Sequence, residues 1–135
     1  MKRAGFTMIE LIFVIVILGI LSAVALPKFI GVSNQAHDSK VEAFTGTLNR
    51  TVGPSLWARS IAEGNSGVSL TYLDTLAELE AQIEVPDELI YQTDGTFDAN
   101  TTAGTTLSIS FFDGNATNAP QWFTTTGAAT NNVAP

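Results

Sequence analysis

The chain has no cysteine among its 135 residues. A disulfide staple and a thiolate metal site are therefore excluded, and the redox compartment is left open. The sequence also lacks a Ser/His/Asp set, a glycine-rich phosphate loop and a cluster of metal ligands at a known spacing. Its one histidine, His37, precedes Asp38 on a helical face where we expect a solvated side chain. We therefore expect no catalytic site, no cofactor and no enzymatic activity.

Positive charge is missing from the C-terminal half of the chain. The net charge is −7, from 6 Lys and Arg against 13 Asp and Glu, and the last base is Arg59. Beyond residue 63 there are nine carboxylates and no base. A surface of this kind repels nucleic acid and anionic lipid. We therefore expect no direct binding of nucleic acid by this part of the protein.

The N-terminus carries one long apolar run. Residues 11–26 are sixteen residues of which only Ser22 is polar. With residues 6–9 added, the run reaches the ~20 residues that a membrane helix needs. Lys2 and Arg3 precede it, so the positive-inside rule keeps the N-terminus cytoplasmic and sends the remainder outward. The sequence thus predicts a single-pass helix in the inner membrane.

Glu10 decides between three interpretations of this run. A secretory signal peptide would be cut at the A-x-A-like site ending in Ala25 and would release a binding domain that begins at Leu26. A plain signal anchor is another interpretation. Neither explains Glu10, because a carboxylate inside an apolar helix costs about 2.5–3.5 kcal/mol. The helix segment holds no base to pair with it, whereas a cut after Gly5 would create an amine at Phe6, four residues away.

The third interpretation rests on a family resemblance. The short basic leader of residues 1–5, followed by Phe-Thr-Met-Ile-Glu and an apolar helix, resembles the N-terminus of the type IV prepilins. The resemblance implies that a prepilin peptidase cuts after Gly5 and methylates the amine of Phe6. It also implies that Glu10 pairs with the Phe6 amine of a neighbouring subunit. Gly19 and Pro27 match positions where the family's helix melts in the filament.

The implied function is that of a structural subunit of a type IV pilus. Copies of the chain would be placed by the pilus assembly machinery in a helical filament on the cell surface, for adhesion or surface motility. The run at residues 25–29 is closest to major pilins of the mannose-sensitive haemagglutinin type. The missing cysteine departs from pilins that close a C-terminal loop with a disulfide, which leaves open how this loop is held. The alternatives are a type II secretion pseudopilin, which has the same N-terminus, and the binding domain released after Ala25.

The expected fold is α+β, with a long N-terminal helix packed against a small antiparallel sheet. We expect a leader at residues 1–5, a membrane and assembly segment at 6–27 and a head at 28–135. Beyond Pro27 the apolar residues recur at helical spacing, which predicts a helix to Ala62. The stripe consists of Val41, Phe44, Leu48, Val52 and Leu56. Gly53-Pro54 predicts a kink or restart, and a shorter helical segment is expected at residues 73–84, before Pro86.

The last third has the pattern of short strands. Residues 89–91, 107–112 and 121–125 are rich in β-branched and aromatic side chains, and turn residues stand at 94–95 and 113–115. We expect an antiparallel meander of three or four strands packed on the helix. Tyr91, Phe111 and Trp122 are expected in its core. Residues 128–135 are expected to form a loosely held tail.

Two weaker patterns suggest sites in the loops. Asp94, Asp98 and Asn100 offer three oxygen side chains within seven residues, which calcium favours, although turn composition explains them equally well and is preferred. Asn100 and Asn115 each fit the acid-x-Asn-x-Thr pattern of bacterial N-glycosylation. Loops rich in threonine and asparagine produce such matches by chance.

Overall fold

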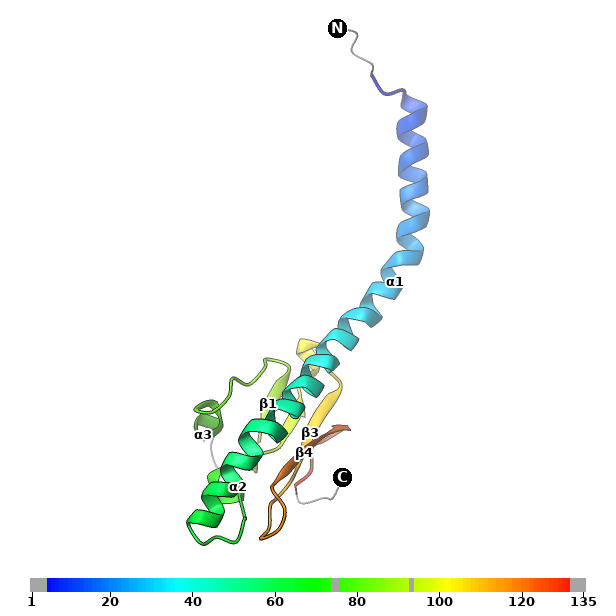
Figure 1. The fold of residues 1–135 in the computed structure, drawn as a ribbon. Helices are drawn as coiled ribbons and strands as arrows, with labels where there is room; N and C mark the ends of the chain where they lie inside the picture. The colour runs from blue at the N-terminus through cyan, green and yellow to red at the C-terminus, as the bar shows by residue number, and fades with distance from the viewer. Residues whose placement is uncertain (1–4, 74–75, 93, 132–135) are drawn as a thin grey trace. The chain divides into compact units, whose positions relative to one another are not determined.

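The computed structural model describes residues 5–73, 76–92 and 94–131. The chain divides into two compact units, Met1–Ser33 and Asn34–Pro135. The helix α1, Met8–Thr47, begins in the first unit and ends in the second (Figure 1). In the first unit its side chains lie on the outside all round, with Phe13 and Val24 each 66% exposed. By length and composition alone, this helix is able to cross a membrane.

The helix of the second unit changes its winding before it ends. α1 is followed by a π-helical turn, η1 (Leu48–Val52), and then by α2 (Gly53–Ala62). Pro54 lacks an amide hydrogen and is tolerated at the first turn of a helix, so a restart at Gly53 removes the conflict. The predicted restart and the predicted end at Ala62 are both confirmed.

The π-helical turn also presents Asn49 to the sheet. The Asn49 side-chain amide donates to the Trp122 carbonyl at 2.7 Å, and its oxygen accepts from the Trp122 amide at 2.8 Å. Trp122 lies on the edge strand β4 (Gln121–Thr126). One side chain therefore satisfies both outward backbone groups of an edge residue, and edge groups of this kind are otherwise open to pairing with another chain.

The four strands form the expected antiparallel meander, in the order β1-β2-β3-β4. β1 (Leu89–Tyr91) and β3 (Leu107–Phe112) have the predicted bounds, and β4 extends one residue further than predicted. The fourth strand, β2 (Phe97–Ala99), was not placed in advance and lies inside the oxygen-rich loop. It is only three residues long, and its one large apolar side chain is the fully buried Phe97.

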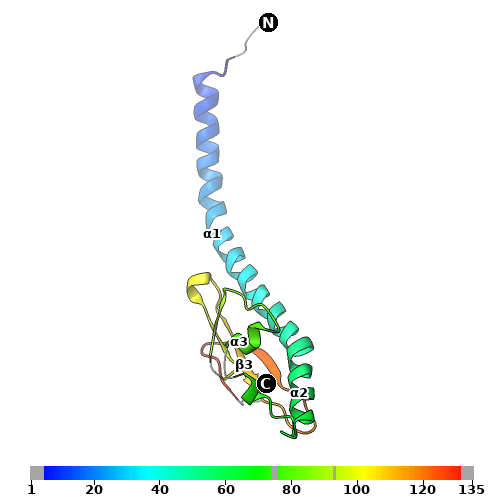
Figure 2. The ribbon, with the colours of Figure 1, turned by 90° about the vertical axis from the view of Figure 1, so that its left-hand side faces the viewer.

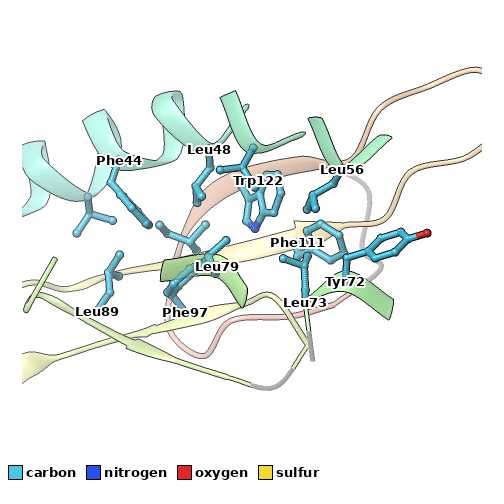
Figure 3. Packing of buried hydrophobic residues seen from close by; sticks show 13 residues of the cluster. Phe44, Leu48, Leu56, Tyr72, Leu73, Leu79, Leu89, Phe97, Phe111 and Trp122 are labelled. Carbon is cyan, nitrogen blue, oxygen red and sulfur yellow. The ribbon is translucent and has the colours of Figure 1, made fainter. Parts of the chain in front are cut away.

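The core lies between the helix and one face of the sheet (Figures 2 and 3). All five residues of the predicted stripe are buried. Phe44 meets Phe97 edge-on at a centroid distance of 5.5 Å, and Phe111 packs on Trp122 at 5.0 Å. Tyr91 is half-buried, and its ring lies 5.3 Å from Phe97. The three predicted core aromatics therefore all contribute, and aromatic pairs add to the stability gained from burial.

The segment between α2 and β1 has less helix than predicted. It contains a 3-10 turn, η2 (Leu70–Tyr72), and a short helix, α3 (Leu76–Glu80). Another 3-10 turn, η3 (Thr101–Ala103), lies later in the chain, between β2 and β3. Of the expected helix over residues 73–84, residues 74–75 lie outside the described part, and among the others only Leu76–Glu80 are helical. Leu79 is fully buried, so α3 covers the core, and after it the chain continues without helix while Ile83 and Val85 still pack against the core.

The turn after α2 is held against the turn before β4. The Trp57 indole donates to the carbonyl of Asn115 at 2.8 Å. Gly67 has φ +86°, and a Cβ there would lie 2.1 Å from the same carbonyl oxygen. Only glycine fits this position.

The C-terminal segment is held by hydrogen bonds, so the predicted loose tail is wrong for residues 128–131. The Phe111 amide donates to the Thr130 carbonyl at 3.0 Å, and the Ala129 amide donates to the Asp98 carboxylate at 2.9 Å. The Thr130 amide donates to the Ser110 hydroxyl at 3.0 Å. The segment pairs with β3 at Phe111, beyond Ile109, where the pairing of β3 with β2 stops. These contacts hold the C-terminal loop without a disulfide. Residues 132–135 lie outside the described part.

Candidate functional site

The start of α1 is a capping box made by Thr7 and Glu10. The Thr7 amide and the Thr7 hydroxyl each donate to Oε2 of Glu10 at 2.8 Å, and the Glu10 amide donates back to the hydroxyl at 3.3 Å. The Thr-x-x-Glu spacing is the signature of this cap, in which the two side chains satisfy each other's free amides. Glu10 is therefore not without a partner in its own chain, because this spacing supplies it with local donors. Its pairing with another subunit stays a prediction.

The predicted cleavage junction lies just before this cap. Gly5, Phe6 and Thr7 have no regular secondary structure, all three are exposed, and the Phe6 side chain is 91% exposed. An exposed backbone without regular secondary structure is the form in which a peptidase most easily reaches a bond. The first four residues of the leader lie outside the described part. In the intact chain the Phe6 nitrogen is an amide, so its predicted pairing with Glu10 as a charged amine stays a prediction.

Gly19 and Pro27 both lie within α1, and in this single chain the helix continues through them. Pro27 has no amide hydrogen, so the carbonyl four residues before it loses its helical donor. Glycine lowers helix stability by about 1 kcal/mol relative to alanine. The segment between the two residues therefore has the least intrinsic helical stability in this half of α1. Its melting in a filament stays a prediction.

A buried carboxylate joins the helix to the segment before β1. Oε1 of Glu88 is 2.6 Å from Nζ of Lys40 and 2.9 Å from Nδ1 of His37. The Glu88 side chain is only 7% exposed. Hydrogen bonds from Lys40 first and His37 second lower the pKa of Glu88 to about 2. The expectation of a solvated His37 is wrong, because the sheet brings a residue 51 positions away onto the helix.

A carboxylate of the helix itself, Asp38, holds the residues just before β3. Oδ1 of Asp38 accepts from the Thr106 amide at 2.9 Å and from the Thr105 hydroxyl at 2.7 Å. These donors, the Thr106 amide foremost, lower the pKa of Asp38. Residues 37–40, about one turn of the helix, thus bind two separate segments of the head, which fixes how the sheet lies against this part of α1.

The predicted calcium ligands each have a protein partner. Oδ1 of Asp94 accepts from the amide and hydroxyl of Thr96 at 3.2 and 2.6 Å. Oδ1 of Asp98 accepts from the Ala129 amide, and the Asn100 side chain donates to a backbone carbonyl. Among the described residues there is no group of three acidic or histidine side chains that would hold a metal ion. These contacts fit the turn interpretation, and calcium binding stays an untested prediction.

The two predicted glycosylation acceptors differ in their contacts. The Asn100 amide nitrogen donates to the Asp87 carbonyl at 2.8 Å, so it is engaged in the folded chain. Asn115 is exposed, and its oxygen accepts from the amides of Thr117 and Asn118 at 2.9 and 3.0 Å. Asn115 is therefore the more accessible acceptor of the two, and modification at either position stays a prediction.

Comparison with known proteins relates the chain to a methylation motif and to a pilus component. Residues 1–26 match the family model described as "Prokaryotic N-terminal methylation motif". The chain is 51% identical over 43 residues to the "Type IV narrow pilus major component PilA5" of Thermus thermophilus, a stretch that covers 32% of this chain and 37% of the relative. No solved structure matches the chain. The matches support the type IV pilin family, and the closer likeness to pilins of the mannose-sensitive haemagglutinin type is not confirmed.

Proposed function

We propose that this chain is a prepilin and that its mature form is a structural subunit of a type IV pilus. The observation that carries the proposal is the order of features at the N-terminus. An exposed Gly5-Phe6 junction is followed by the Thr7–Glu10 cap and then by a helix that is apolar on all sides. Prepilin peptidase would cut after Gly5 and methylate the new amine of Phe6.

The apolar part of α1 has two successive environments in this proposal. Each large apolar side chain loses roughly 1.5–3 kcal/mol when it is exposed to water, so the helix needs lipid or other helices around it. Lipid provides this in the inner membrane, and packed copies of the same helix provide it in the filament. The proposed division is a leader at residues 1–5, a membrane and assembly segment at 6–27, and a head at 28–135 that lies outside the cytoplasm.

Glu10 is the proposed assembly group. Both hydrogen bonds from Thr7 go to Oε2, and no described residue donates to Oε1. The cap thus holds the carboxylate in a fixed orientation while one oxygen is left for a charged donor from another subunit. Cleavage supplies such a donor, the methylated amine of Phe6. An ion pair formed in an apolar surrounding is strong because little water screens it.

The mature N-terminus tests the proposal directly. Protein recovered from cell membranes or sheared filaments is expected to begin with N-methyl-Phe6, as read by mass spectrometry. A Gly5→Arg variant is expected to keep its leader. A mature protein that begins at Leu26 would instead identify a domain released by signal peptidase and would end the prepilin proposal.

The pseudopilin alternative is tested by what a deletion strain loses. The similarity to a named pilus component favours a pilus, so we expect loss of surface filaments, with adhesion or motility reduced. Retention of filaments together with loss of protein secretion would identify a type II secretion pseudopilin.

A further inference from the structure

Among the described residues of the second unit, Arg50 is the base without an ion pair. Lys40 binds Glu88 at 2.6 Å, and Arg59 binds a carboxylate on its own helix at 2.9 Å. Arg50 is exposed on η1 and donates from Nε to the carbonyl of Gly46 at 3.1 Å. It forms no ion pair with any described carboxylate. In the described part of this unit, the Arg50 guanidinium is therefore exposed to solvent on η1 without a carboxylate partner.

The complementary charge lies on another part of the same unit. A hollow of about 330 Å³ is lined by residues 84–88 and Lys40. Glu84 and Asp87 are exposed at this hollow, and within the described chain neither carboxylate is in an ion pair. The charge of Lys40 is already compensated by buried Glu88, so the two outer carboxylates leave the hollow negative.

One subunit cannot bring these two surfaces together. The hollow lies beside Lys40, and Arg50 follows ten residues later, which is roughly 15 Å along a helix. Charges on two different patches are satisfied when one copy presents the first patch and the next copy presents the second. Contacts of this heterologous kind continue from copy to copy and build open helical filaments, whereas a self-complementary patch stops at a dimer.

We propose that Arg50 of one copy binds the hollow between Glu84 and Asp87 of a second copy in the filament. This rests on the proposed function as a pilus subunit. The planar guanidinium matches two carboxylates, and its aliphatic stem would pack on Val85 and Pro86, which also line the hollow. The contact selects which face of the next subunit each helix meets.

Charge exchange in the full chain, expressed in its own host strain, tests the contact. We expect Arg50→Glu to lower the yield of sheared filaments by about tenfold, and the double variant Glu84→Arg, Asp87→Arg to do the same. The triple variant that combines all three changes is expected to restore filaments, because it reverses both sides of one interface. Glu42→Lys is the matched control, since Glu42 is an exposed acid on the same helix away from the hollow.

The yield is normalised to the pool of N-methylated mature subunit in the membrane, so that a failure of cleavage or folding is separated from a failure of assembly. Wild-type filament yield from Arg50→Glu overturns the contact, as does a triple variant that is processed normally and yet forms no filaments. An equal loss in Glu42→Lys also overturns it, because reversal of any charge on this part of the helix would then have the same effect. Absence of wild-type filaments ends the pilus proposal itself, which distinguishes the two failures.

Discussion

Replacing Glu88 by glutamine is expected to destabilise the head at neutral pH and to flatten its response to acid. The folded chain lowers the pKa of Glu88 from 4.5 to about 2. Stability from this shift is therefore present above pH 4.5 and is lost as the pH falls toward 2. A shift of this size corresponds to at most roughly 3 kcal/mol. Lys40 is 60% exposed and its charge is screened by water, so we expect about 1–2 kcal/mol.

The assay is thermal unfolding of the full chain in detergent, followed by near-ultraviolet circular dichroism between pH 2 and pH 8. At pH 7 we expect Glu88→Gln to lower the Tm by about 5–10 °C. As the pH falls from 4.5 to about 2 the two curves are expected to converge, because the unfolded chain takes up the proton first and Glu88 of the folded wild type is protonated only near pH 2. Glu42→Gln is the control, because Glu42 is an exposed acid on α1 that forms no ion pair with a described residue. Curves for wild type and Glu88→Gln that stay parallel over the whole range would refute the reasoning.

Three further outcomes are expected. Asn49→Leu leaves both outward groups of Trp122 without a partner, so the free energy of unfolding in urea is expected to fall by about 1–3 kcal/mol, and an unchanged value would contradict the edge cap. Gly67→Ala places a Cβ against the Asn115 carbonyl at positive φ and is expected to lower the same free energy by at least about 2 kcal/mol, with Gly64→Ala, at an open turn position, as its control. A calcium chelator is expected to leave the Tm unchanged, since the loop oxygens at 94–100 have protein partners, and a lower Tm would revive the calcium site.

The features that the sequence predicted well are those carried by periodicity. The apolar stripe from Val41 to Leu56 follows one face of a helix, and each member is buried because helical spacing alone determines which residues share a face. The bounds of β1 and β3 were likewise set by β-branched and aromatic runs between turn residues.

The features that were missed depend on residues distant in the sequence. His37 looked solvated because nothing near it in the chain indicates Glu88, which arrives only when the sheet folds onto the helix. The C-terminal segment was predicted to be loose because its partners, the Phe111 amide and the side chains of Ser110 and Asp98, are distant from it in the sequence. The Thr7–Glu10 cap is different, because its Thr-x-x-Glu spacing is a local pattern from which the cap could have been predicted.

The way in which residues 129–131 are fastened affects how the head behaves outside the cell. A loop closed by a disulfide requires an oxidant in order to form and opens when a reductant or a thiol-exchange enzyme reaches it. Here the closure consists of hydrogen bonds from Phe111, Ala129 and Thr130, and it forms whenever the sheet forms. The head therefore matures without oxidative folding enzymes and is indifferent to the redox state of its surroundings. If shear separates this segment from β3, we expect the same hydrogen bonds to form again when the load is released, because no covalent bond is broken.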